Sequence, residues 1–189
     1  MLNDNFDSYN NGDLNGQGNW SGSALFDIQD SVVQQGAKAG VIVGDGSLHV
    51  IAKSFNPETE GIQTCYVRQA VNSENFDIIL LEDTTIDVII RLQDDGNIAY
   101  WDGDLSAYTA IQSYNANQWY KFDIQVRKSD KKARYRVDNG TWTDWKTTRI
   151  SYTTAINGLR IRKPAGGTAT CYFDNFFESK VPKSQGHIF

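Results

Sequence analysis

The chain has few of the residues that build metal centres and nucleophilic active sites. It contains two histidines and two cysteines, with no Cys-x-x-Cys pair and no His–Cys cluster. Structural zinc sites need four such ligands at short spacings, so the sequence does not indicate a zinc centre. Phosphate-binding loops, dinucleotide fingerprints and Gly-x-Ser-x-Gly elbows are missing as well.

Positive charge is also in short supply. The 18 Lys and Arg residues face 23 Asp and Glu residues, for a formal net charge of −5. The densest basic stretch, Arg127 to Arg136, is broken by a turn and alternates with Ala and Tyr, which is typical of a solvated hairpin. Nucleic-acid binding requires a basic face, so we expect no nucleic-acid partner.

Long hydrophobic runs are missing too. No stretch approaches the roughly 20 apolar residues of a membrane-spanning helix, so we expect no membrane insertion. The first residues, MLNDNFDSYNNG, are too polar for a signal peptide. Two explanations stay open: a protein that remains inside the cell, or a module taken from a larger protein.

What fills the chain is a succession of short strand patterns separated by Gly-, Asp- and Asn-rich turns. The clearest patterns are residues 47–55, 62–71, 76–82, 84–93, 97–102, 118–128, 132–138 and 158–163. No window sustains a helical period, so we expect almost no helix. About a dozen short strands with short turns predict an all-β sandwich or barrel.

The chain shows no internal boundary. No Pro/Ser-rich linker interrupts it, so we expect one domain over residues 1–180 and a tail or linker at 181–189. The least clear segment, residues 31–40, is interpreted as a strand, a turn and a second strand. For residues 133–145 we expect a hairpin in which Asn139–Gly140 supplies the positive φ of the turn.

Alternation separates buried from exposed positions within single strands. In residues 119–127, Tyr120, Phe122, Ile124 and Val126 share one face, whereas Trp119, Lys121, Asp123, Gln125 and Arg127 share the other. Residues 84–93 alternate in the same way, with Ile86 among the core-facing positions. Such strands predict sheets with one buried face and one solvated face.

The two cysteines lie in strand patterns far apart in the sequence. Cys65 and Cys171 each precede a large apolar residue by two positions (Val67 and Phe173), which predicts that both thiols face the core. Two buried free thiols are one interpretation. A disulfide between neighbouring strands is the alternative, because sequence does not give the distance between them.

Paired carboxylates would be needed for glycoside hydrolysis. The candidate pairs are Glu82 with Asp83, Asp87 with Asp123, and Asp102 with Asp104. The first and third pairs lie in turn patterns, and the second would be mixed with Lys and Arg on a solvated face. Surface charge is therefore the favoured interpretation of all three.

Aromatic residues on solvated faces are the stronger functional signal. The apolar faces of sugars stack on Trp and Tyr, and their hydroxyls need planar polar partners. Filling of a sandwich core is the alternative role for any single aromatic residue. The candidate ligand-binding residues are Tyr66, Arg68, Trp101, Trp119 and Trp142.

The order of several motifs resembles that of concanavalin A-like (laminin-G-like) jelly rolls, including carbohydrate-binding modules with this fold. These motifs are the acidic, Gly-rich opening at 3–20, the strand patterns at 34–43 and 117–127, the hairpin at 133–142, and the closing YFDNFFE at 172–178. The resemblance implies a two-sheet antiparallel β-sandwich in which the first and last strands are neighbours.

The resemblance also implies a structural calcium ion at the seam between these two strands. The matching residues are Asp7 in the opening motif and Asp174 in the closing one, and carboxylate and backbone oxygens are the ligands that calcium prefers. The alternative is that Asp174 accepts backbone N–H bonds without a metal.

The functional hypotheses follow from what the resemblance lacks. No Glu-x-Asp-x-Glu strand of the laminarinase type is present, and YVRQAV offers only one of the residues of an alginate-lyase-like site. The resemblance therefore implies a non-catalytic module, extracellular or surface-exposed, that binds a polysaccharide or surface glycan and belongs to a larger protein or assembly. The alternatives are a structural jelly roll (adhesin, surface or virion component) and a polysaccharide lyase or hydrolase.

Overall fold

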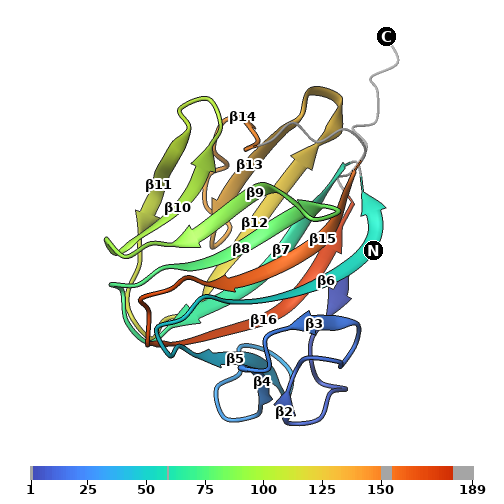
Figure 1. Cartoon of the computed structure of the whole chain (residues 1–189). Coiled ribbons are helices and arrows are strands. Elements are labelled where there is room, and N and C mark those ends of the chain that lie inside the picture. Colours follow the sequence, from blue (N-terminus) through green and yellow to red (C-terminus); the bar gives the residue numbers. More distant parts are fainter. Residues whose placement is uncertain (1, 59, 150–154, 181–189) are drawn as a thin grey trace.

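The computed structural model describes residues 2–58, 60–149 and 155–180, and the expected tail at 181–189 lies outside them. Two antiparallel sheets pack face to face (Figure 1). This arrangement confirms the predicted all-β sandwich. The described residues contain one short 3₁₀ turn, Lys128–Asp130, and no helix long and apolar enough to span a membrane.

We call the nine-stranded sheet sheet A. Its central path runs β14-β13-β12-β7-β16-β5-β4-β2, and β1 pairs with β16. The strands are β1 (Asn3–Asp4), β2 (Gly12–Asp13), β4 (Phe26–Gln29), β5 (Ala39–Val43), β7 (Glu60–Gln69), β12 (Tyr120–Arg127), β13 (Lys132–Val137), β14 (Lys146–Thr147) and β16 (Thr170–Ser179).

The seven-stranded sheet is sheet B, with the order β11-β10-β9-β8-β15-β6-β3. Its strands are β3 (Trp20–Gly22), β6 (His49–Glu58), β8 (Phe76–Glu82), β9 (Thr85–Leu92), β10 (Asn97–Asp102), β11 (Ala107–Ser113) and β15 (Ile156–Lys163). The eight clearest strand patterns of the sequence all coincide with strands of these two sheets.

The main core lies between the inner faces of the sheets. In β12, Phe122, Ile124 and Val126 are buried there, and Val88 and Ile90 of β9 approach from sheet B. Period-two alternation places every second residue of each strand in this core. The remaining residues form two outer faces, one on each sheet.

Residues 31–38 correct the sequence interpretation of the segment before β5. Only Ala39–Val43 is a strand, and the preceding residues form a loop. The backbone N–H groups of Gln34 and Gln35 donate to the Asp174 carboxylate instead of to a neighbouring strand. Side-chain acceptors that are distant in the sequence thus replace the strand-to-strand hydrogen bonds that the pattern predicted.

Two local features differ from expectation by one residue. In the hairpin after β13, the positive φ angles belong to Asp138 (50°) and Asn139 (60°), and Gly140 donates its N–H to Val137. In β9, a bulge opposite Leu80 and Leu81 changes the direction of Ile86, which packs on the outer face of sheet B instead of in the main core.

Both cysteines are buried and free, so the disulfide alternative is wrong. Cys171 pairs with Gln69 across β16 and β7, whereas Cys65 lies four residues further along β7. At about 3.3 Å per residue, this stagger exceeds the reach of a disulfide. Burial raises the pKa of both thiols, that of Cys171 to about 12.

Candidate functional site

The outer face of sheet A brings together four of the five predicted ligand-binding residues. Tyr66 and Arg68 point outward from β7 because their neighbours Cys65 and Val67 are buried in the core. Trp119 immediately precedes β12, and Trp142 lies between β13 and β14. All four side chains are half-buried, so each presents part of its surface to solvent.

Three residues at one end of this face form a group that we call the aromatic platform: Trp119, Tyr172 and Arg68. The rings of Trp119 and Tyr172 have centroids 6.4 Å apart, and the Arg68 guanidinium lies 5.4 Å from the Tyr172 ring. Arg68 also donates to the Asn117 side chain at 3.2 Å. Tyr172 was not among the predicted residues, although its position between the inward-facing Cys171 and Phe173 marked it as outward.

A second group, the Arg–Trp ladder, follows the β12–β13–β14 edge of the same face. Its five side chains alternate in the order Arg127, Trp145, Arg134, Trp142 and Arg136. Each guanidinium carbon lies 3.9–4.8 Å from the ring or rings beside it. Trp142 therefore contacts two guanidinium groups, which leaves less of its ring for a sugar than the sequence suggested.

Asp123 lies on the same outer face and contacts the ladder through Arg136. Its carboxylate accepts hydrogen bonds from Thr64 Oγ1 at 2.6 Å and Arg136 Nε at 2.7 Å, and Lys121 Nζ lies 3.2 Å away. The Asp123 side chain is 1% exposed. These contacts hold Asp123 in place as a structural anion, and burial together with this charge raises the pKa of Tyr66.

Trp101, the fifth predicted residue, lies on the opposite side of the molecule. It points outward from β10 of sheet B and packs edge-to-face against Tyr108 at 5.3 Å. The Arg149 guanidinium lies 5.6 Å from its ring. As predicted from alternation, Tyr100 and Trp101 point to opposite faces, and Tyr100 is the buried one.

The structure also separates the one carboxylate pair that was expected on a common face. Asp87 belongs to β9 of sheet B and Asp123 to β12 of sheet A. Asp87 is fully buried in sheet B. Burial, with a smaller contribution from Glu82, raises the pKa of Asp87 to about 7.

The seam between β1 and β16 exists as expected, and both of its predicted acids bind one loop. Asp174 accepts N–H bonds from Gln34, Gln35 and Asn175, and Asp7 accepts bonds from the N–H groups of Ala37 and Lys38. Burial raises the pKa of Asp174 to about 6.

The surroundings of Asp7 and Asp174 are poorly suited to the predicted calcium ion. N–H groups engage most lone pairs of both carboxylates, and no group of three or more His, Cys, Asp or Glu side chains in residues 2–58, 60–149 and 155–180 could hold a metal. The contacts favour the backbone alternative for Asp174, and calcium stays a prediction to be tested.

Asp4 is a buried acid of the opening motif that sequence reasoning missed. Its Oδ2 accepts bonds from Tyr9 Oη, Trp20 Nε1 and Lys53 Nζ at 2.6–2.8 Å. Burial, with Asp4 as a further cause, raises the pKa of Tyr9 above its ordinary range. This cluster stabilises the seam and leaves no group free for chemistry.

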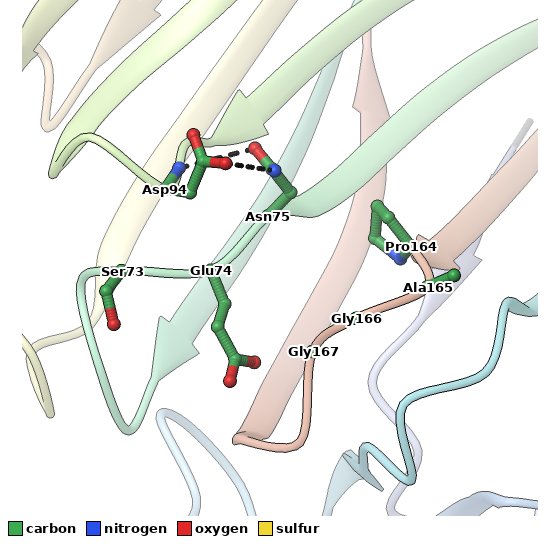
Figure 2. Close-up of a pocket in the computed structure, with 8 residues that line it drawn as sticks. All are labelled: Ser73, Glu74, Asn75, Asp94, Pro164, Ala165, Gly166 and Gly167. Atoms are coloured by element: carbon green, nitrogen blue, oxygen red, sulfur yellow. Dashed lines mark hydrogen bonds between the residues drawn. The ribbon is translucent and has the colours of Figure 1, made fainter.

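A small pocket of about 190 Å³ lies among the loops at one end of the sandwich (Figure 2). Asn75 and Asp94 bond to each other at its wall, as Figure 2 shows, and Glu74 binds Lys163 Nζ at 2.6 Å. The volume is below the usual range of small-molecule sites. Its lining is Ser73, Glu74, Asn75, Asp94, Pro164, Ala165, Gly166 and Gly167.

No protein-family model matches this chain, and no curated protein matches it in sequence. Solved structures do match in shape. A sialidase aligns with a TM-score of 0.74 at 15% identity, over 96% of this chain and 18% of the sialidase chain. The present chain thus spans less than a fifth of the length of that protein.

Two smaller proteins align over most of both chains. The catalytic domain of a glycoside hydrolase family 131 protein from Coprinopsis cinerea has a TM-score of 0.61 at 8% identity, over 87% of this chain and 84% of its own. Carbohydrate-binding module CBM66 from Bacillus subtilis has a TM-score of 0.55 at 9% identity, over 86% and 96%. Together these likenesses show that the chain has the concanavalin A-like jelly-roll fold.

Proposed function

We propose that this chain is a non-catalytic module that binds a glycan on the outer face of sheet A. The observation that carries the proposal is the aromatic platform, where Trp119, Tyr172 and Arg68 meet half-exposed on one face. Such a surface offers stacking area to the apolar face of a sugar and donors to its hydroxyls. The fold likeness to a carbohydrate-binding module supports the same class of function.

The non-catalytic part of the proposal rests on the acids of this face. Asp123 is held by Thr64, Arg136 and Lys121, and Asp174 is held by backbone N–H groups. A retaining or inverting glycosidase needs two carboxyl groups facing each other across the scissile bond. A polysaccharide ligand implies an extracellular or cell-surface location as part of the proposal.

Binding to a panel of soluble polysaccharides, measured by affinity electrophoresis and calorimetry, tests the proposal. Trp119→Ala should weaken binding at least about tenfold, because it removes the largest stacking surface of the platform. Trp101→Ala is the matched control, since it removes a half-buried Trp from the opposite sheet. Equal losses in both variants, or release of sugar by the wild-type protein, would contradict the proposal.

A further inference from the structure

The Arg–Trp ladder differs from the aromatic platform in how its rings are used. Trp142 contacts Arg134 and Arg136, and Trp145 contacts Arg127 and Arg134, all within 3.9–4.8 Å. Guanidinium groups thus occupy ring surface that a sugar would need for stacking. What the ladder offers to a ligand is the set of N–H donors on its arginines.

The charge of the ladder is incompletely neutralised. Arg127 pairs with Asp130, and Arg136 pairs with Asp123. Arg134, the central arginine, donates its Nε to the neutral Gln125 side chain at 2.8 Å and has no carboxylate within ion-pair distance in the described part of the chain. Partial burial and the charges of Arg127 and Arg136 both lower the pKa of Arg134.

This local excess of positive charge contrasts with the whole chain, whose formal net charge is −5. A general basic character therefore does not explain it. Arginines fixed on aromatic rings also lose less rotational freedom on binding than free surface arginines do. The ladder is thus a preorganised group of planar donors with an unmatched charge at its centre.

We propose that the ladder is an anion-binding subsite and that the ligand of this face is an acidic glycan bearing carboxylate or sulfate groups. The inference rests on the proposed glycan-binding function and specifies its ligand class. The terminal nitrogens of Arg134 bind the anionic group, while Arg127 and Arg136 add to the attraction. A guanidinium fork matches the geometry of carboxylate and sulfate oxygens better than a lysine ammonium does.

The ladder and the platform lie on the same outer face of sheet A, on different strands and at different heights along them. β13 carries Arg134 and Arg136, and it neighbours β12, then β7 with Arg68, then β16 with Tyr172. Three strand spacings of about 4.8 Å separate β13 from β16. Along the strands, Arg134 is level with Ile62, six residues from Arg68 on β7, which adds about 20 Å. A chain of several sugars can therefore reach from the platform to the ladder.

The test uses polymers that differ only in charge. Polygalacturonate is compared with its methyl ester, and dextran sulfate with dextran, by calorimetry at about 0.05 M and about 0.5 M salt. The wild-type protein should bind at least one acidic member about tenfold more tightly than its neutral counterpart, and high salt should reduce this difference.

Three variants assign the effect to the ladder. Arg134→Gln should weaken binding of the acidic polymer about tenfold, and Arg134→Lys should restore only part of the loss. Arg160→Gln is the matched control: it removes the same charge from β15 of sheet B, where Arg160 points outward between the buried Leu159 and Ile161. Thermal unfolding of each variant shows whether the fold is intact.

The outcomes separate the two proposals. Equal binding of acidic and neutral polymers, or equal losses in Arg134→Gln and Arg160→Gln, would overturn the ladder as an anion subsite but leave glycan binding standing. Binding of none of the four polymers would overturn both proposals. Tighter binding of a single-stranded oligonucleotide than of either acidic polymer would overturn the assignment of the ligand as a glycan.

Discussion

The two outer faces of the sandwich follow the same alternation and yet have different contents. On sheet A, the outward residues include Trp119, Tyr172 and the Arg–Trp ladder, all with surface available to solvent. On sheet B, three outward aliphatic residues (Ile79, Leu81 and Ile89) form a second apolar cluster and are at most 2% exposed.

Arginines have different roles on the two faces. On sheet B, Arg91 and Arg162 both bind the fully buried Asp77, and Arg91 also stacks on Tyr108 at 4.1 Å. On sheet A, the central Arg134 donates to the neutral Gln125 side chain and has no carboxylate partner among residues 2–58, 60–149 and 155–180. The buried contacts on the outer face of sheet B therefore stabilise the fold, whereas the outer face of sheet A leaves donors and rings exposed, as the proposed glycan binding requires.

The largest expected effect is on sheet B. Asp77→Ala should lower the free energy of unfolding by about 4 kcal/mol, because it leaves two partly buried arginines without their anion. Urea denaturation measures the change. Asp130→Ala breaks an exposed ion pair beside sheet A and should cost less than about 1 kcal/mol. Similar losses in the free energy of unfolding for the two variants would show that the ion pairs of sheet B are no more stabilising than those of sheet A.

Asp87 of sheet B should make stability depend on pH. Its folded-state pKa of about 7 lies above the ordinary value, so the folded protein binds more protons than the unfolded chain between these values. Its contribution to the free energy of unfolding therefore falls as the pH rises from about 4 to about 7.

Asp87→Asn should abolish this part of the pH dependence. The variant should match the wild type near pH 3 and be more stable by on the order of 4 kcal/mol near pH 8. Denaturation midpoints across this range provide the measurement. Parallel pH profiles for the two proteins would show that Asp87 titrates normally.

The next test of stability concerns Asp174, at the seam between β1 and β16 of sheet A. Asp174→Ala should lower the free energy of unfolding by about 2 kcal/mol, since three backbone N–H groups lose an acceptor. If these groups replace calcium, a chelator should leave the melting temperature of the wild type unchanged. A lower melting temperature in chelator that added calcium restores would instead establish the metal site.

A small effect on stability is expected at the aromatic platform. Trp119→Ala should lower the free energy of unfolding by about 1 kcal/mol, because its ring is half-exposed and packs mainly on Tyr172. Ile89→Ala, from the buried cluster of sheet B, should cost about 3 kcal/mol. A larger loss for Trp119 would give that residue a structural role.

Much of the fold could be predicted from alternation and turn residues. The pattern of residues 118–128 identified the strand β12 and the direction of its side chains, and the patterns around Cys65 and Cys171 placed both thiols in the core. The expectation of a solvated outer face was wrong for Asp123 and Gln125, which are buried. The loop at 31–38 could not be predicted, because its N–H groups bond to Asp7 and Asp174, which are distant in sequence.

The candidate site was predictable in part. Tyr66, Arg68 and Trp119 followed from the periods of their own strands. Trp142 was also predicted to bind ligand, but its contacts with two arginines were not foreseen, and Tyr172 was not predicted. The contacts of Trp142 depend on how the segment before β14 aligns with β13. That alignment follows from backbone bonds, such as the one from Thr143 N to Tyr135 O, that no local pattern reveals.

By itself, the sequence determined where most strands lie and which residues of a regular strand face inward, because side chains alternate with a period of two within such a strand. Only the tertiary structure decided which sheet each strand joins. That choice put Trp119, Tyr172 and the ladder on one surface and Trp101 on the other. Sheet membership depends on pairing between distant segments, such as β7 with β16, and pairing of this kind leaves no local signal.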